Sequence, residues 1–305
     1  WEPLVYVAGP RFGVATNPTL IRLANGTILC FYNERPDDGK HPFTIMSVRS
    51  DDRGKSWSSP RQLFAADVRF ENGCWEPDAI QLPSGELQLF FANESPYRSS
   101  AEQEITLLRS HDNGANWTQP QTISFREGHR DGMPVPLVLR DGKGIVVAIE
   151  DNGLNGRFKP VIVHTSVAEN WQGPSVIGDS GRRWSALQPS LPANVYAGAP
   201  YVCQMPTGST ILSVQSDEGG RSQPQMVVYI GDSNAKNFSN KSVPFQVAPN
   251  ISCLWNSLFV KDSDTVTAIS GTTIRGARGV WSIDGRFVET QSFGTEPGVV
   301  GTIKR

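Results

Sequence analysis

The sequence predicts an all-β fold, a six-bladed β-propeller with four antiparallel strands in each blade, and five blades are the alternative. The first observation is a repeat in which a proline is followed by a glycine eight residues later and by an acidic residue near the end of the next strand. Its four copies begin at Pro18, Pro77, Pro134 and Pro200, at intervals of 59, 57 and 66 residues. The second is that Gly and Pro punctuate short apolar runs, with no helical spacing. A fixed period of this length, built from short strands, is typical of a propeller.

Each copy of the repeat supplies the first two strands of a blade, and the residues after it supply the other two. The first two copies are Asn17–Glu34 and Glu76–Glu94. We expect the remaining strands of these two blades at Phe43–Arg49, Gln62–Phe64, Glu104–Arg109 and Gln121–Ser124.

The later blades are less regular. The third and fourth copies are Met133–Glu150 and Ala199–Glu218, and a weaker fifth copy begins at Trp255. We expect a sixth blade that the two ends of the chain share, formed by Val280–Phe287, Val299–Ile303 and the N-terminal strand Leu4–Val7. This closure would remove the free sheet edge and make residues 1–305 a single propeller domain.

Two stretches, Ser50–Trp57 and Ser110–Trp117, share the pattern S-x-D-x-G-x-x-W. Their glycines permit the positive φ of a tight hairpin, and their aspartates can accept backbone N–H groups within the turn. Their tryptophans can pack between adjacent sheets. In a four-stranded blade this turn joins the third and fourth strands, at the end opposite the start of the first strand. We therefore expect Asp52 and Asp112 to be structural.

The strand order places the candidate functional site at the other face. Blade strands run alternately, so the residues before each proline lie beside those that end the second strand. The candidates collected in this way are Asn17, Glu34, Glu76, Arg130, Asp131, Glu150, Asp217, Glu218 and Trp255. A ring of carboxylates suits glycoside hydrolysis, which needs one protonated acid and one ionised group. The same oxygens could bind Ca²⁺, and a purely structural role is equally open for Glu34 and Glu94.

Composition and motifs exclude several other functions. The net charge is −2 and there is no basic stripe, which argues against nucleic acid as a partner. No apolar run reaches the length of a membrane span, and no targeting segment is visible. The cysteines lack metal-type spacing and no hydrolase elbow, zinc or phosphate motif occurs, so we expect no metal and no organic cofactor. Six N-x-[ST] sequons favour a secreted glycoprotein, which we expect to be a monomer.

Three strings of residues resemble one enzyme family. They are WEPDAIQL at Trp75–Leu82, RDGMPVPLVLRDGK at Arg130–Lys143 followed by IED, and APYV at Ala199–Val202 followed by SDE. They look like glycoside hydrolase family 93, which comprises exo-acting α-1,5-L-arabinanases on a six-bladed, sialidase-type propeller. The S-x-D-x-G-x-x-W boxes resemble the Asp-box of that wider superfamily. The resemblance covers roughly residues 15–260.

The resemblance implies retaining hydrolysis of an oligo- or polysaccharide, with release of arabinobiose from linear arabinan. By their place in the matching motifs, the catalytic pair is expected to be Glu150 as the general acid/base and Glu218 as the nucleophile, with the reverse assignment left open. Asp217 could take the role of Glu218 if the strand register shifted by one residue. A separation of about 5–5.5 Å between the two carboxyl groups would suit retention, and about 6.5–9.5 Å would suit inversion. Another α-linked plant sugar is also open as the substrate.

Two other functions stay open. Sialidases carry an arginine two residues before the first proline, but this chain has Thr16 there. A sialidase would also need a tyrosine nucleophile, for which Tyr196 is the only residue near the right place. A non-catalytic carbohydrate-binding propeller would instead rely on exposed aromatic residues such as Trp75, Trp184 and Trp255.

Overall fold

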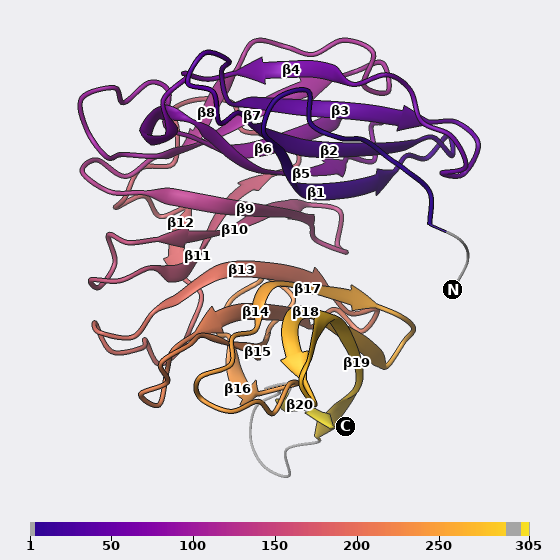
Figure 1. The fold of residues 1–305 in the computed structure, drawn as a ribbon. Coiled ribbons are helices and arrows are strands. Elements are labelled where there is room, and N and C mark those ends of the chain that lie inside the picture. The colour runs from indigo at the N-terminus through magenta and orange to yellow at the C-terminus, as the bar shows by residue number, and fades with distance from the viewer. Residues whose placement is uncertain (1–3, 291–299, 305) are drawn as a thin grey trace. The chain divides into compact units, whose positions relative to one another are not determined.

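The computed structural model describes residues 4–290 and 300–304, whose regular secondary structure is antiparallel β-sheet apart from one short 3₁₀ helix (Figure 1). The chain divides into two compact units. The first comprises the residues up to Pro136 together with Gly173–Gly178, and the second comprises Leu137–Gln172 and the residues from Asp179 onwards. The expected single domain stays a prediction.

The first unit holds two complete four-stranded sheets with their strands in sequence order. The first blade contains β1 (Val14–Arg22), β2 (Ile28–Arg35), β3 (Thr44–Ser50) and β4 (Arg61–Ala65). The second contains β5 (Cys74–Gln81), β6 (Leu87–Asn93), β7 (Glu104–Ser110) and β8 (Gln121–Ser124). A short 3₁₀ helix, η1 (Phe70–Asn72), precedes β5, and the described residues contain no other helix. The strands predicted from the first two repeats are therefore confirmed.

The remaining strands form three further four-stranded sheets. The third blade contains β9 (Asp131–Val138), β10 (Gly144–Asp151), β11 (Lys159–Ser166) and β12 (Arg183–Ser185). The fourth contains β13 (Ala197–Gln204), β14 (Thr210–Ser216), β15 (Gln225–Gly231) and β16 (Ser239–Ser242). The fifth contains β17 (Leu254–Val260), β18 (Thr265–Ile274), β19 (Ala277–Thr290) and β20 (Val300–Lys304).

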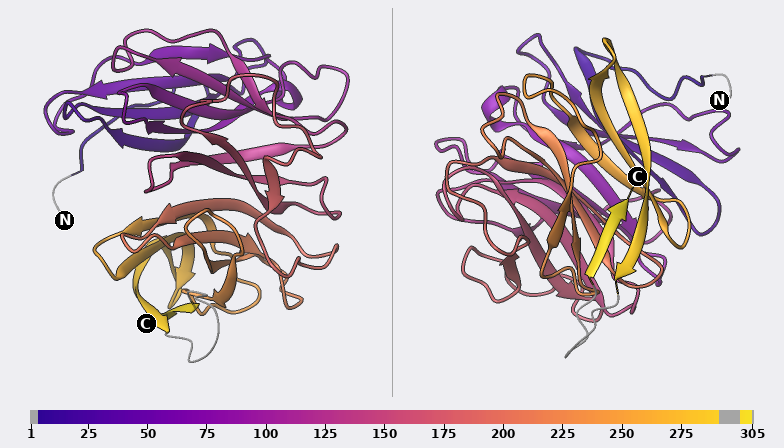
Figure 2. Two further views of the ribbon diagram at one scale, coloured as in Figure 1. Left: turned by 180° about the vertical axis from the view of Figure 1, so that it is seen from behind. Right: turned by 90° about the horizontal axis from the view of Figure 1, so that it is seen from below.

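The prediction of six blades is wrong, because the described residues form five. The sequence pattern placed Trp255 and Val280–Phe287 in different blades. In the structure, β18 and β19 form one long hairpin that turns at Arg275 and Gly276, both with positive φ (Figure 2). The hairpin brings the four C-terminal strands into a single sheet. These strands therefore complete one blade and leave none for a sixth.

The two ends of the chain also differ from the prediction. The expected strand Val299–Ile303 corresponds to β20, which pairs with β19, while Val299 itself lies outside the described residues. Leu4–Val7 does not join this sheet, since residues 4–13 contain no strand. The N-terminal segment is instead anchored to the first blade through Arg11, as described below.

The middle strands of the blades form the core. All seven residues of β6 are buried, and β10 and β14 are buried along almost their whole length. Strands covered on both faces read as continuous apolar runs rather than as alternating ones. The first strand of the first blade instead alternates, with Leu20 63% exposed.

Both S-x-D-x-G-x-x-W boxes adopt the turn that the sequence predicts. Asp112 accepts hydrogen bonds from Ser110 Oγ at 2.9 Å and from the N–H of Asn116 at 2.7 Å, and Asp52 makes the matching contacts in its own box. These bonds lower the pKa of each aspartate to about 2. Trp117 packs edge-on against Phe31 of the neighbouring blade, with ring centroids 5.7 Å apart. The structural interpretation of the boxes is confirmed.

Candidate functional site

The first strand of every blade carries the same unusual backbone near its start. One residue there, which we call the bulge residue, has a positive φ of 47–55°. The five bulge residues are Asn17, Glu76, Met133, Ala199 and Trp255. In β1, β5, β13 and β17 the strand register shifts at this point, as it does at a β-bulge. A positive φ is uncommon for residues other than glycine, and such bulges re-aim side chains beside functional sites.

The strand pairing brings the bulge residues to the ends of the second strands. In the first blade, Thr16 pairs with Asn33, directly before Glu34. In the fourth blade, Ala197 pairs with Ser216, directly before Asp217. The prediction that these two groups of residues share a face is therefore confirmed within each of these blades.

Glu150, near the end of β10, is held against the first strand of the following blade. The backbone N–H of Ala199 donates to Glu150 Oε2 at 2.8 Å. A Cβ at Gly198 would come closer than 3.0 Å to both Glu150 Oε2 and Tyr196 Oη. The carboxylate and the phenol therefore flank the same point of the backbone, and only glycine leaves room for both. Both side chains belong to partly exposed residues.

The Tyr196 hydroxyl is bound by Gln215, a buried residue near the end of β14. Gln215 Nε2 donates to Tyr196 Oη at 3.0 Å, and Gln215 Oε1 accepts the backbone N–H of Trp255 at 3.2 Å. Burial and the charge of Glu150 raise the pKa of the Tyr196 phenol well above its usual range. The phenol is therefore protonated at neutral pH and can act as a hydrogen-bond donor.

Asp217 lies on the other side of Tyr196. Its carboxylate accepts the backbone N–H of Tyr196 at 2.8 Å and Nη1 of Arg157 at 2.5 Å. The Arg157 guanidinium also lies over the Tyr196 ring, 5.5 Å from its centroid. Two carboxylates thus share one tyrosine, and we call the set Glu150, Tyr196, Gln215, Asp217 and Arg157 the Tyr196 cluster. All of it lies in the second unit.

Glu218, the other predicted catalytic residue, points to a different neighbour. Its carboxylate accepts a hydrogen bond from Lys241 Nζ at 2.8 Å, and Lys241 lies on β16, the last strand of the blade. Its backbone N–H is capped by Ser216 Oγ at 3.1 Å. Glu218 shares no hydrogen-bond partner with Glu150 among the contacts described.

Glu34, a predicted binding residue, anchors the N-terminal segment. Arg11 donates to Glu34 Oε2 from Nε at 3.0 Å and from Nη2 at 2.7 Å, and the N–H of Phe12 adds a third bond at 3.2 Å. Burial raises the pKa of Glu34, but these bonds outweigh it and hold the pKa below its usual value. The residue is 1% exposed, so the contacts favour its structural interpretation.

Asn17 and Glu76 meet around Arg35, which ends β2. Arg35 donates to Asn17 Oδ1 at 2.5 Å and lies 3.9 Å from Glu76 Oε1. Its guanidinium also covers the Trp75 ring at 4.8 Å. The structure thus brings the bulge residues of the first two blades to one arginine.

Arg130, Asp131 and Glu94 form a third group in the first unit. Arg130 Nη2 donates to Glu94 Oε1, which also accepts Gln103 Nε2 at 3.1 Å. Asp131 is fully buried and accepts Ser124 Oγ at 2.6 Å. Glu94 is 3% exposed, so these contacts are largely internal.

The three candidate tryptophans differ sharply in exposure. Trp75 is 5% exposed and packs against Phe43 and Phe70. Trp184 is partly buried and is covered by Lys236 Nζ, 4.7 Å from the ring centroid. Trp255 is 60% exposed and is the member of this set with a ring available for stacking on a ligand.

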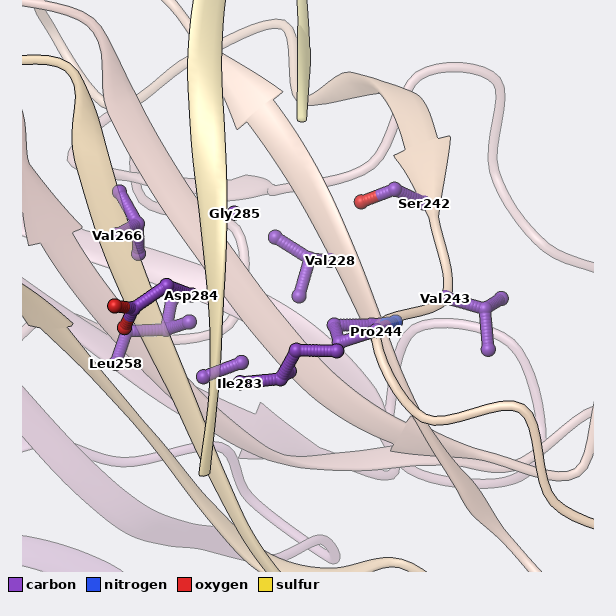
Figure 3. Close-up of a pocket in the computed structure, with 10 residues that line it drawn as sticks. Val228, Ser242, Val243, Pro244, Leu258, Val266, Ile283, Asp284 and Gly285 are labelled. Carbon is purple, nitrogen blue, oxygen red and sulfur yellow. The ribbon is translucent and has the colours of Figure 1, made fainter. Parts of the chain in front are cut away.

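The cavities described differ in their place relative to the Tyr196 cluster, and the one of about 250 Å³ is lined by Lys159 and Pro160, of which Pro160 pairs with Glu150. One of about 220 Å³ lies between strands of the fourth and fifth blades, with mainly aliphatic walls that include Val228, Leu258 and Ile283 (Figure 3). Asp284 is the one acidic residue that lines it. A single carboxylate among aliphatic side chains does not provide the acid pair that glycoside hydrolysis needs.

Among the described residues, no group of three or more His, Cys, Asp or Glu side chains is placed to hold a metal ion. Within the same residues, no helix has the length and apolar character needed to cross a membrane.

Comparison with known families adds one assignment. A family model described as a BNR repeat-like domain matches residues 26–222, more than half of the chain. The chain belongs to the BNR repeat-like family. No curated protein matches the chain. The family supports the predicted sialidase-like superfamily, while membership of glycoside hydrolase family 93 stays a prediction.

The BNR repeat-like protein is also similar to solved structures of glycosidases. The GH93 α-L-arabinofuranosidase of Fusarium graminearum, solved with arabinobiose, is 19% identical, covers 88% of this chain and 76% of its own, and has a TM-score of 0.66. The α-L-arabinanase of Penicillium chrysogenum is 18% identical over 86% and 78%, with a TM-score of 0.60. The NanB sialidase of Streptococcus pneumoniae is 14% identical over 93% and 60%, with a TM-score of 0.63. At these identities the similarity shows the fold alone.

Sequence reasoning missed Gln215, Arg157 and Gly198. Arg157 lies in a loop outside every repeat, and its contact with Asp217 depends on the path of that loop. Gln215 lies near the end of β14, two residues before Asp217, which directly follows the strand, so strand alternation could have drawn attention to it. Gly198 precedes the bulge residue Ala199, where close approach of a side chain is a reason for glycine.

Proposed function

We propose that this protein is a glycoside hydrolase of the sialidase-like superfamily whose active site is the Tyr196 cluster. The observation that carries the proposal is that Glu150 and Asp217 both contact the segment around Tyr196, beside the bulge residue Ala199. Glycoside hydrolysis uses two carboxyl groups, one to exchange a proton with the leaving oxygen and one that acts in its ionised form.

The contacts suggest a role for each carboxylate. Asp217 accepts hydrogen bonds from Arg157 and from a backbone N–H, and such contacts suit a carboxylate that acts as a nucleophile or a base. Glu150 lies beside the Tyr196 phenol, which suits a group that gains and loses a proton during the reaction. We therefore propose Glu150 as the general acid/base. For the second carboxylate the contacts favour Asp217, which binds the Tyr196 segment. Glu218 is the alternative, and its carboxylate accepts a hydrogen bond from Lys241 instead.

The proposed substrate is an α-linked arabinose oligosaccharide or polysaccharide, from which arabinobiose is released with retention. Two features support this choice: the sequence resemblance, and the fold shared with enzymes solved with arabinobiose. A sialidase is the second candidate, because Tyr196 lies beside Glu150 as a tyrosine nucleophile with an adjacent carboxylate would.

Product analysis tests both candidates. Wild-type protein is incubated with linear α-1,5-arabinan and, separately, with a sialylated oligosaccharide, and the released sugars are separated by chromatography. The variants Glu150→Gln, Asp217→Asn and Glu218→Gln are compared with the control Asp232→Asn. In the contacts described, the carboxylate of Asp232 binds only its own turn between β15 and β16, so its loss should leave the rate unchanged.

Arabinobiose as the product would support the arabinanase, and free sialic acid would support the sialidase. We expect Glu150→Gln to lower kcat by about 10²- to 10⁴-fold, the usual contribution of a catalytic acid. A similar loss in Asp217→Asn or in Glu218→Gln identifies the second carboxylate. Binding of a sugar without any hydrolysis would instead support a non-catalytic carbohydrate-binding protein.

We also propose that the protein is secreted and glycosylated. The sequons at Asn25 and Asn250 are exposed, whereas Asn93 is 3% exposed and bonds to Thr106. Peptide mass spectrometry of protein secreted from eukaryotic cells should find glycans at the exposed sequons and none at Asn93.

A further inference from the structure

We propose that Gln215 is a positioning residue that directs the Tyr196 hydroxyl towards Glu150 and fixes the backbone beneath the exposed Trp255. Gln215 is 6% exposed, and the nitrogen and the oxygen of its amide each make one of these two contacts. The kinetic part of this inference rests on the proposed hydrolase function, whereas the hydrogen-bond geometry does not.

The orientation of the Gln215 amide follows from its partners. The backbone N–H of Trp255 can only donate, so the amide atom that faces it at 3.2 Å is the oxygen. The nitrogen must then face Tyr196 Oη, where it lies at 3.0 Å. An amide nitrogen can only donate, so the phenol oxygen accepts this bond. The phenol's own hydrogen is therefore available for a different acceptor.

Four groups besides the backbone surround the Tyr196 side chain: Glu150, Arg157, Gln215 and Asp217. Arg157 has no acceptor atom, and Gln215 presents its nitrogen. Asp217 lies on the backbone side of Tyr196, where its Oδ1 accepts the Tyr196 N–H and its Oδ2 accepts Arg157. Glu150 Oε2 and the phenol oxygen both lie within 3.0 Å of the position that a Cβ at Gly198 would take, so Glu150 is the carboxylate beside the hydroxyl end of the ring. Glu150 is thus the acceptor towards which Gln215 directs the phenol hydrogen.

The second contact links this hydroxyl to the next blade. Trp255 is the bulge residue of the fifth blade, with a φ of 55°, and its N–H is bound by Gln215. This bond restrains the backbone from which the exposed indole extends. Gln215 therefore connects the backbone of Trp255, the candidate sugar-stacking residue, to the Tyr196 hydroxyl beside Glu150.

Two substitutions separate the two contacts. In Gln215→Glu, the carboxylate still accepts the Trp255 N–H, but it must also accept from Tyr196, so the phenol hydrogen turns away from Glu150. We expect the alkaline limb of the kcat/KM profile to move to higher pH, because the carboxylate form of Glu150 loses a donor. The rate at the optimum should fall about tenfold while KM stays unchanged. In Gln215→Met both contacts are lost, so KM should rise as well.

Gln204→Met is the matched control. Gln204 is 5% exposed and also uses both ends of its amide, donating to Gly208 and Ser233 and accepting from Arg140. It should lower stability without changing the pH profile or KM. A Gln215→Glu profile that matches the wild type, or a Gln215→Met protein that behaves as Gln204→Met does, overturns the inference.

Two further measurements do not depend on hydrolysis. Hydrogen exchange of the Trp255 amide should accelerate in Gln215→Met and stay slow in Gln204→Met. The phenolate absorbance of Tyr196, obtained by subtracting a Tyr196→Phe protein, should appear at higher pH in Gln215→Met, because a donor to the phenolate is lost. If the wild type hydrolyses no sugar, the proposed function fails. Unchanged exchange and titration overturn the positioning role in either case.

Discussion

Gly198 gives the sharpest test of where the active site lies, because its missing side chain leaves room for two proposed functional groups. A Cβ at this position would lie 2.6 Å from Tyr196 Oη and 2.7 Å from Tyr196 Cε2, and closer still to Glu150 Oε2. Ordinary contact begins near 3.4 Å, so Gly198→Ala must push the phenol oxygen back by about 0.8 Å, and the carboxylate by at least as much. Displacements of about 1 Å at reacting groups lower rates by about 100-fold, or about 3 kcal/mol of transition-state free energy.

Stability should change much less than activity in this variant. The atoms that must move are the ends of side chains on partly exposed residues, so we expect a loss of about 1–2 kcal/mol in the free energy of unfolding. The assay is kcat/KM on the substrate identified by product analysis, together with urea unfolding. Gly181→Ala is the control, because a Cβ there meets nothing within 4 Å. A folded Gly198→Ala protein with the wild-type rate would refute the placement of the active site beside Gly198.

Three further predictions concern stability and the boundaries of the site. Burial raises the pKa of Asp78 to about 6, although hydrogen bonds from Thr19 and from a backbone N–H oppose the shift, so ionisation above that pH costs stability. Asp78→Asn should therefore raise the free energy of unfolding at neutral pH by about 1–2 kcal/mol and have little effect below about pH 4, and urea titrations that show no pH dependence of this difference would contradict it. Arg183 and Asp151 form a 2.5 Å ion pair with exposures of 1% and 0%, so Arg183→Met should cost about 3–5 kcal/mol in thermal or urea unfolding. Asp112→Ala should leave kcat/KM unchanged, and a large loss of rate would place the Asp-boxes in the active site.

The blades were predictable where local pattern and pairing agree. Proline, glycine and alternating apolar residues predicted the first two strands of each blade. The S-x-D-x-G-x-x-W boxes predicted the turn between the third and fourth strands, so the first two blades follow the prediction closely. The number of blades was not predictable in the same way. The residues from Trp255 onwards carry no S-x-D-x-G-x-x-W box. Nothing in the local sequence shows that β18 and β19 form one long hairpin and not strands of two different blades.

The candidate site was predictable at the level of the face but not of the contacts. Strand direction alone places Glu150 and Asp217 near the bulge residues. Which carboxylate meets which cation depends on long side chains from other segments, such as Arg157 from a loop and Lys241 from the last strand of its blade. The contact of Glu34 was equally unpredictable, because its carboxylate binds Arg11, which lies 23 residues earlier in the chain. Such contacts are set by tertiary geometry, which no short motif records.

The bulge at the start of each blade has a consequence for how such a protein can diversify. Its backbone is nearly the same whether the residue is asparagine, glutamate, methionine, alanine or tryptophan, with φ between 47 and 55° throughout. A conformation that tolerates five such different side chains does not depend on any one of them. Substitution of a bulge residue should therefore change the side chain presented at the start of that blade while the blade itself stays folded. New ligand preferences could arise there one residue at a time, without insertion of a loop or repacking of a core.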